Sequence, residues 1–321
     1  MTKLLEINDL SIEFDSGAER NRAINNISIT VDRGEIVGVV GESGCGKTIT
    51  GLSVLRLLPD TASITSGNVR IDGDDVLSLS NKKLRALRGS KVAMIFQDPS
   101  TSLNPVFTVA SQMRRVVKQH RDISSAETRR LMSERLEAVG LSDIDRVLAA
   151  YPHELSGGMK QRVMIAMALI GEPELLIADE PTTALDVTVQ SQILALLMDI
   201  RDRFDLGIML ISHDLGVVSQ VVDRVVVLYA GSVVERGPVP HFAEPEHPYT
   251  KGLIGSIPKS TTERGSLEPI EGTVPYDPGG IGGCVYASRC PDRMDVCLEA
   301  APSLDAVGIG TAVACYLVGQ R

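Results

Sequence analysis

The chain has 321 residues, which at roughly 150 residues per domain predicts about two domains. It carries 41 Asp and Glu against 32 Lys and Arg, and 43% of its residues are hydrophobic. This composition is typical of a folded globular protein and excludes an intrinsically disordered chain. The net charge of −9 argues against non-specific binding of nucleic acid, which needs clustered basic residues.

No stretch of the sequence reaches the ~18 apolar residues that a membrane-spanning helix requires. The densest apolar run, residues 163–170, ends at Gly171, and the first residues contain no apolar segment of signal-peptide length. We therefore expect a cytosolic chain that reaches a membrane only through a partner.

The first two thirds of the chain alternate between strand and helix patterns. Short apolar segments predict strands at residues 4–14, 23–31, 35–40, 92–96, 175–178, 208–212 and 224–229. Helical patterns lie between several of them, notably at residues 47–58, 158–170 and 187–203. This alternation predicts an α/β fold with a parallel sheet that is covered on both faces.

Two regions depart from this alternation. Residues 98–165 contain helical segments, such as 126–139, and no convincing strand, so they predict a helical insertion. After about Gly237 glycine and proline become frequent, which predicts an irregular C-terminal module with a linker at about residues 260–283.

A phosphate-binding loop follows the predicted strand at residues 35–40. Its sequence fits G-x-x-x-x-G-K-[ST] and consists of Gly41, Glu42, Ser43, Gly44, Cys45, Gly46, Lys47 and Thr48. The glycines let successive backbone N–H groups converge on a phosphate, and the next helix adds its N-terminal dipole. Lys47 supplies positive charge to the phosphates, and Thr48 offers a hydroxyl to Mg²⁺.

Chance produces this pattern in about one chain of this length per hundred. The alternative, a glycine-rich turn with a surface lysine, is therefore weak. Cys45 lies beside the start of a helix, where thiol pKa values can fall. We nevertheless expect Cys45 to contribute only its backbone N–H.

A second chemical motif follows the predicted strand at residues 175–178, which runs directly into Asp179 and Glu180. A buried parallel strand brings these carboxylates to the C-terminal edge of the sheet, where α/β proteins bind ligands. One carboxylate suits Mg²⁺, and Glu180 suits activation of an attacking water. An acidic strand end is a weak signal alone, but together with a phosphate loop it indicates a nucleoside triphosphatase.

Three further sequence elements indicate which class of nucleoside triphosphatase this is. Ser156, Gly157 and Gly158 precede a predicted helix, where the serine is either an ordinary N-cap or part of a second anion site. Gln97 follows a strand and is either a loop amide or a contact to Mg²⁺ or water. His213 ends another strand at the same sheet edge; a lone histidine is more often structural than catalytic, but this position shifts the balance toward catalysis.

In this order and spacing the motifs resemble the ATP-binding subunit of an ABC transporter, over about residues 4–236. The resemblance implies an α/β fold of the ABC-type P-loop NTPase class. Such a fold has a RecA-like core, a helical insertion subdomain (about residues 98–165) and N-terminal antiparallel strands, here followed by a small irregular Cys-rich C-terminal module.

The resemblance also assigns roles to individual residues. Phe14 would stack on adenine, His213 would be the switch histidine, and Asp186 would be the D-loop acid. Residues 41–49, which are the phosphate loop and Ile49, would also contact the nucleotide. Further contacts would come from Gln97 as the Q-loop glutamine and from Asp179 at the acidic strand end. Ser156, Gly157 and Gly158 would form the signature motif, which also contacts nucleotide. Mg²⁺ would be bound by Thr48, Gln97 and Asp179.

The C-terminal region indicates which subfamily of ABC transporter ATPases the chain resembles. Residues 247–253 and 283–291 resemble the C-terminal extension of dipeptide/oligopeptide importer ATPases, parts of which nickel importers share. We therefore predict an ATPase domain at residues 1–240 and a C-terminal extension at residues 241–321.

The resemblance implies hydrolysis of ATP coupled to peptide uptake across a bacterial inner membrane. Glu180 would be the general base, His213 would hold water and phosphate, and Lys47 with Mg²⁺ would neutralise charge. The implied partners are a second, related ATPase chain, two membrane-spanning permeases and a solute-binding protein. The chain itself would lie at the cytoplasmic face of that membrane.

Three alternatives remain open from the sequence. The first is import of nickel or another solute by the same transporter family. The second is a soluble ABC ATPase acting on DNA or ribosomes, which the net charge of −9 and the single ATPase cassette disfavour. The third is a non-catalytic regulatory cassette, which the presence of Lys47, Glu180 and His213 disfavours.

Four of the five cysteines lie together near the end of the chain. Cys284, Cys290, Cys297 and Cys315 have the spacing C-x5-C-x6-C-x17-C, which in a cytosolic protein indicates a metal before disulfides. By ligand count they suit zinc or an iron–sulfur cluster equally, but the absence of C-x2-C pairs favours [4Fe–4S].

The resemblance to the peptide-importer extension implies the same cluster. The alternatives are zinc, four reduced and unliganded thiols, or disulfides formed on isolation. We expect a structural or redox-sensing role, because these cysteines lie far in sequence from the phosphate chemistry.

Overall fold

A computed structural model describes residues 3–15, 17, 20–183, 185–257, 270–275 and 278–318. The chain divides into two compact units. The helical unit contains residues up to 4, 31–35 and 78–209, and the phosphate-loop unit contains residues 5–30, 36–77 and 210 onward. Much of the predicted linker at residues 260–283 lies outside the described residues.

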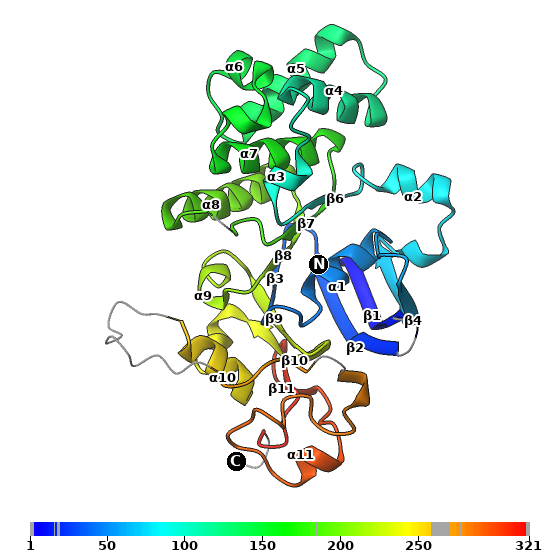
Figure 1. The fold of residues 1–321 in the computed structure, drawn as a ribbon, viewed down its shortest axis with the longest axis vertical. Coiled ribbons are helices and arrows are strands. Elements are labelled where there is room, and N and C mark those ends of the chain that lie inside the picture. Colours follow the sequence, from blue (N-terminus) through cyan, green and yellow to red (C-terminus); the bar gives the residue numbers. More distant parts are fainter. Residues whose placement is uncertain are drawn as a thin grey trace. The chain divides into compact units, whose positions relative to one another are not determined.

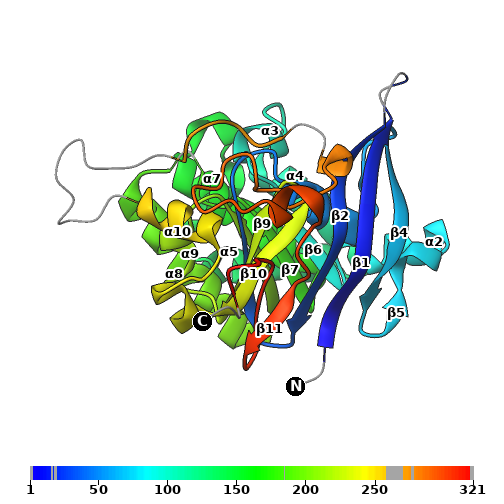
Figure 2. The ribbon, with the colours of Figure 1, turned by 90° about the horizontal axis from the view of Figure 1, so that it is seen from below.

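One sheet of the phosphate-loop unit has the strand order β2-β1-β4-β5. The strands are β1 (Lys3–Asp15), β2 (Arg20–Asp32), β4 (Ala62–Ile71) and β5 (Asp74–Asp75). β1, β2 and β4 lie side by side in both views of the ribbon (Figures 1 and 2). β1 pairs antiparallel with β4, from Leu5 opposite Ile71 to Phe14 opposite Ala62. The sequence does not predict β4, because its exposed middle is polar and contains Gly67.

The strands of the second sheet that lie wholly in this unit have the order β11-β12-β10-β9-β3. Its strands are β3 (Ile36–Val40), β9 (Arg224–Tyr229), β10 (Ser232–Pro238), β11 (Asp305–Gly308) and β12 (Thr311–Val313). β3 and β9 pair in parallel, as their continuous apolar sequences predict. β12 pairs antiparallel with β10, with Glu235 opposite Val313. The C-terminal module is therefore less irregular than expected, because it adds two strands to this sheet.

The helices of the phosphate-loop unit are short. They are α1 (Lys47–Val54), α9 (Leu215–Val218), α10 (Pro248–Gly255) and α11 (Val296–Glu299). α1 ends four residues earlier than the predicted Leu58, because Arg56 takes a left-handed conformation with φ +49° and Pro59 follows.

The helical unit contains two parallel strands, β6 (Val92–Ile95) and β7 (Leu175–Asp179). Its helices are α2 (Asn81–Leu87), α3 (Pro99–Ser102), α4 (Val109–His120), α5 (Ser125–Ala138), α6 (Ile144–Ala149), α7 (Gly157–Ala168) and α8 (Val187–Phe204). α4 packs against α5, α6 and α7 (Figure 1). Residues 98–165 contain no strand, as their sequence predicts.

Local sequence explains where α5 begins and which face it buries. Ser124 and Glu127 form a capping box, in which each side chain accepts a hydrogen bond from the other's backbone N–H. Met132 and Leu136, four residues apart, are both buried on one face of the helix.

β8 (Gly207–Ser212) passes along the chain from one unit into the other. The described residues also form five short 3₁₀ helices, at Val76–Ser78, Pro152–Glu154, Leu169–Gly171, Val239–Ala243 and Pro278–Gly280. Within the described part of the chain, no helix has the length and apolarity needed to cross a bilayer.

Candidate functional site

The phosphate loop connects β3 to α1 in the phosphate-loop unit. Its three glycines have positive φ angles, +156° at Gly41, +81° at Gly44 and +102° at Gly46. A Cβ on Gly41 would lie 2.2 Å from the Leu228 carbonyl oxygen, and one on Gly46 would lie 2.4 Å from the Ile24 Cδ1. Both positions therefore require glycine for conformation and for space.

The N-terminus of α1 suits an anion. Gly46 is its N-cap, no side chain caps it, and its first turn contains no acidic residue. The positive end of the helix dipole is therefore not offset by a carboxylate. Thr48, which is exposed, and Ile49, which is half-buried, lie in this first turn, and Ser43 lies exposed in the loop before it.

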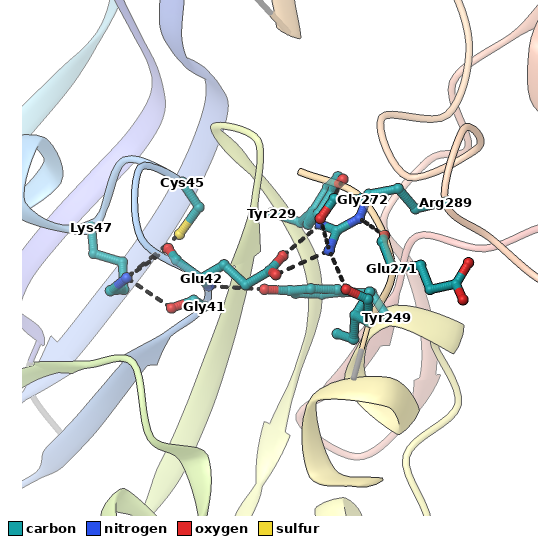
Figure 3. Close-up of polar contacts among 10 residues, drawn as sticks. Gly41, Glu42, Cys45, Lys47, Tyr229, Tyr249, Glu271, Gly272 and Arg289 are labelled. Carbon is teal, nitrogen blue, oxygen red and sulfur yellow. Dashed lines mark hydrogen bonds and ion pairs between the residues drawn. The ribbon is translucent and has the colours of Figure 1, made fainter. Parts of the chain in front are cut away.

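The Lys47 side chain turns back onto the loop. It is buried, and its Nζ donates hydrogen bonds to the carbonyl oxygens of Gly41 at 2.8 Å and Glu42 at 2.9 Å (Figure 3). Cys45 is also fully buried, and burial raises the pKa of its thiol. A raised pKa disfavours the reactive thiolate form of Cys45.

Two further predicted residues lie in the same unit. Phe14 is half-buried near the end of β1. His213 follows β8 directly and is exposed, and its neighbour Asp214 caps α9 by accepting a hydrogen bond from the Val217 N–H at 3.0 Å. The cap fixes the chain direction immediately after His213.

The acidic strand end belongs to the helical unit. Asp179 is the last residue of β7 and is 2% exposed. Glu180 follows with φ +45°, a left-handed conformation that costs a non-glycine residue roughly 1–2 kcal/mol. Its Oε2 accepts hydrogen bonds from the Gln97 Nε2 at 2.9 Å and the Thr183 Oγ1 at 2.8 Å. The structure thus brings Gln97 and Glu180 together, although they are 83 positions apart.

Ser156, Gly157 and Gly158 begin α7 in the helical unit. The Ser156 hydroxyl accepts a hydrogen bond from the Met159 N–H at 3.3 Å, so the residue does serve as an N-cap. A Cβ on Gly158 would lie 2.8 Å from the Val189 Cγ1, so glycine permits the close approach of α8. Ser156 and Gly157 remain exposed.

Asp186, the predicted D-loop acid, caps α8. Its Oδ1 accepts a hydrogen bond from the Val189 N–H at 2.9 Å. The predicted site residues therefore form two groups, each described within its own unit. Phe14, the phosphate loop and His213 belong to the phosphate-loop unit, and Gln97, Ser156–Gly158, Asp179, Glu180 and Asp186 belong to the helical unit.

The four C-terminal cysteines all line one small enclosed cavity. None of them forms a disulfide, and the Cys284 N–H donates to the Cys297 carbonyl at 2.7 Å. Burial raises the thiol pKa of Cys284 and Cys315, and that of Cys290 to about 11. Among the described residues, no three His, Cys, Asp or Glu side chains are arranged to hold a single metal ion.

Two residues that the motifs do not identify contact the phosphate loop. Arg289 forms an ion pair with Glu42, and the Tyr249 hydroxyl accepts a hydrogen bond from the Glu42 N–H (Figure 3). Both residues lie in the segments that resemble the peptide-importer extension. Nothing in their local sequence relates them to the loop.

Comparison with known proteins identifies both parts of the chain. Residues 24–183 match the ABC transporter family model, and residues 234–297 match the model of the oligopeptide/dipeptide transporter C-terminal region. Over 316 residues the chain is 48% identical to the probable peptide ABC transporter ATP-binding protein y4tR of Sinorhizobium fredii, covering 98% of this chain and 94% of that protein. It is 44% identical to the dipeptide transport ATP-binding protein DppD of Bacillus subtilis, covering 100% and 96%.

A solved structure gives the same fold. A dimeric ATP-binding cassette in a post-hydrolysis state, bound to ADP and phosphate, matches with a TM-score of 0.66 and 27% identity, covering 74% of this chain and 99% of that one. The predicted ABC-type α/β fold is thereby confirmed. By its phosphate loop, its fold and its similarity over the whole length, the chain belongs to the oligopeptide/dipeptide group of ABC transporter ATP-binding proteins, and it is an ATPase that uses ATP with Mg²⁺.

Proposed function

We propose that this chain hydrolyses ATP to power the import of peptides across a bacterial inner membrane. The main support for the proposal is the match of the C-terminal region to oligopeptide/dipeptide transporters. The same chain has a phosphate loop in which the Lys47 Nζ donates a hydrogen bond to the Gly41 carbonyl. We place the ATPase domain at residues 1–240, with its helical subdomain at residues 98–165, and the extension at residues 241–321.

Residues from both groups of predicted site residues bind ATP. Backbone N–H groups of the phosphate loop and the Lys47 ammonium bind the β- and γ-phosphates, and Phe14 stacks on adenine. Thr48, Gln97 and Asp179 are oxygen donors of the kind that Mg²⁺ prefers, and they would hold the ion. When bound there, Mg²⁺ would neutralise charge that develops on the phosphates.

Hydrolysis falls to Glu180 and His213. Glu180 takes a proton from the water whose oxygen attacks the γ-phosphorus, and the bond to ADP breaks. The hydrogen bonds from Gln97 and Thr183 orient the Glu180 carboxylate for this task. His213 holds the water and the γ-phosphate.

The reaction requires a second ATPase chain. Ser156, Gly157 and Gly158 are positioned to bind the nucleotide of a partner subunit, with Asp186 at the same interface. The exposure of Ser156 and Gly157 at the start of α7 supports this role, as does the dimeric state of the matching solved cassette. The partner is a related but different chain, and two permeases and an extracytoplasmic solute-binding protein complete the transporter. The chain is peripheral to the cytoplasmic face of the membrane.

Reconstitution of the transporter tests this function. Purified alone, the chain is expected to hydrolyse ATP slowly. In that state no second chain supplies the Ser156–Gly158 segment that completes each nucleotide site. Assembled in proteoliposomes with the second ATPase and the permeases, it should turn over faster and take up labelled peptide when the loaded binding protein is added.

Several outcomes would contradict the proposal. Full ATPase activity from a strictly monomeric preparation would show that no second chain is needed. Uptake of Ni²⁺ but not peptide would favour the nickel alternative. Copurification with DNA or ribosomes, without integral membrane proteins, would favour the soluble ABC ATPase.

We also propose that Cys284, Cys290, Cys297 and Cys315 hold a [4Fe–4S] cluster. The support is that four cysteines with free thiols line one cavity. Burial raises the thiol pKa of Cys284, Cys290 and Cys315, and a cluster would hold the four cysteines as thiolates. A cluster bound by all four cysteines would crosslink the C-terminal extension, which has little hydrophobic core of its own, and would stabilise its fold.

Anaerobic purification tests the cluster. We expect brown protein with broad visible absorbance and about four irons per chain. Cys297→Ser should lower the iron content, whereas Cys45→Ser, in the phosphate loop, should leave it unchanged. Colourless protein with stoichiometric zinc would refute the cluster. Full activity of protein that carries no iron or zinc would refute any role for a metal at these four cysteines.

A further inference from the structure

The Arg289 side chain joins the segment between Cys284 and Cys290 to the phosphate loop through Glu42. Its Nη1 donates to the Glu42 Oε2 at 2.7 Å and its Nη2 to the Oε1 at 3.1 Å, so the guanidinium binds the carboxylate through two hydrogen bonds. The Arg289 side chain is only 4% exposed. A bidentate pair of this kind is screened little by solvent, and it fixes the direction of the carboxylate.

The guanidinium is itself held in place by its surroundings. Its Nε donates to the Glu271 carbonyl at 2.7 Å, and its Nη2 donates to the carbonyls of Ile270 at 3.1 Å and Gly272 at 3.3 Å. The Tyr229 hydroxyl accepts a further hydrogen bond from Nη1 at 3.3 Å. The pair with Glu42 raises the pKa of Arg289, which stays charged. Arg289 is therefore a fixed anchor for Glu42.

Tyr249 provides a second anchor, from α10. Its hydroxyl accepts a hydrogen bond from the Glu42 N–H at 2.9 Å. Its ring is fully buried between Tyr229 and Tyr286, with ring centroids 4.6 Å and 5.4 Å away. Its own backbone N–H donates to the Nδ1 of His247, which caps α10. Packing and the cap together fix where the hydroxyl lies.

Every polar group of Glu42 thus has a partner. The Lys47 Nζ and the Cys45 N–H donate to its carbonyl, Tyr249 accepts from its N–H, and Arg289 binds its carboxylate. Two of these four partners, Tyr249 and Arg289, lie in the C-terminal extension. Three glycines leave the loop free to adopt many conformations when it is not held, so contacts that fix Glu42 select one of them.

We propose that Arg289 and Tyr249 are positioning residues for the ATPase reaction, which hold the phosphate loop of their own chain in its nucleotide-binding conformation. Neither residue touches ATP in this proposal, and both act through Glu42. A loop that is ordered before the ligand arrives binds more tightly, because the entropy of ordering is not lost on binding. The proposal rests on the proposed function only in that the loop binds ATP.

Equilibrium binding of a fluorescent ATP analogue with Mg²⁺ to the full chain tests the proposal. For Arg289→Ala we expect the dissociation constant to rise by about tenfold, as when one preorganising contact is lost. Tyr249→Phe, which keeps the ring and removes only the hydroxyl, should weaken binding by a smaller factor. In the assembled transporter, Arg289→Ala should raise KM and leave kcat nearly unchanged. Arg293→Ala, which alters an exposed arginine four positions further along the C-terminal extension, is the matched control.

A double-mutant cycle separates positioning from a general loss of structure. If Arg289 acts through Glu42, the pair Glu42→Gln with Arg289→Ala should bind no more weakly than Arg289→Ala alone. Binding by Arg289→Ala within twofold of wild type would overturn the proposal, and so would fully additive losses in the double variant. If Arg289→Ala does not fold, Tyr249→Phe and Glu42→Gln decide the question. Wild-type protein that fails to bind the analogue would instead contradict the proposed function.

Discussion

Replacing Glu180 with glutamine is expected to abolish most ATP turnover in the assembled transporter while ATP binding persists. The amide has the size of the carboxylate but does not accept the proton of the attacking water. Loss of a general base lowers turnover by roughly 10²–10⁴-fold. The amide oxygen retains the ability to accept hydrogen bonds from Gln97 and Thr183, so the local structure has no reason to change.

The measurement is steady-state phosphate release, alongside the dissociation constant for ATP. Glu134→Gln is the matched control, because Glu134 is an exposed carboxylate of α5, distant along the chain from the acidic strand end. Turnover of Glu180→Gln near the wild-type rate would show that another group is the base. Loss of ATP binding would show that Glu180 acts on the ground state.

Replacing Lys47 with alanine is expected to act one step earlier, on binding itself. The ammonium is buried at the loop and donates to two of its carbonyls, so in the presence of ATP it is in place to bind phosphate oxygens. Hydrogen bonds to charged groups contribute about 1.5–3 kcal/mol each, which predicts a rise of roughly 10- to 100-fold in the dissociation constant for ATP.

Titration of the full chain with a fluorescent ATP analogue measures this effect. Lys83→Ala, which alters an exposed lysine of α2, should bind like wild type. The variant also removes the donor to the Gly41 and Glu42 carbonyls, so its thermal unfolding should be recorded with the binding data. A dissociation constant within twofold of wild type would remove Lys47 from the phosphate site.

The sequence alone predicts the chemistry of the nucleotide site. The phosphate loop depends on glycine spacing and on a lysine at the start of a helix, and both are visible within eight consecutive residues. The acidic strand end is equally local, because the strand is a continuous apolar run that terminates in Asp179. Gln97 and Glu180 follow two parallel strands, so the same reasoning places them at one sheet edge, and the structure joins them by a hydrogen bond.

The strand pairing of the C-terminal module could not be predicted in this way. Residues 311–313 form a strand too short to show a period, and they become one by pairing with β10, whose sequence lies more than 70 positions earlier. β4 has the same difficulty, because its polar middle resembles a loop until β1 pairs with it. Pairing across long separations depends on the whole fold and leaves little mark on the local sequence.

The sequence by itself thus determined that the chain binds a nucleoside triphosphate, and which side chains are chemically suited to do so. Only the tertiary structure decided what holds that machinery in place. Arg289 and Glu42 are 247 positions apart, and the local sequence around either residue gives no indication that the two interact. The sequence places the cysteine module far from the phosphate chemistry, whereas in the folded chain Arg289, directly before Cys290, contacts the loop. Charge complementarity acts between groups that are close in space, and a chain must fold before such groups meet.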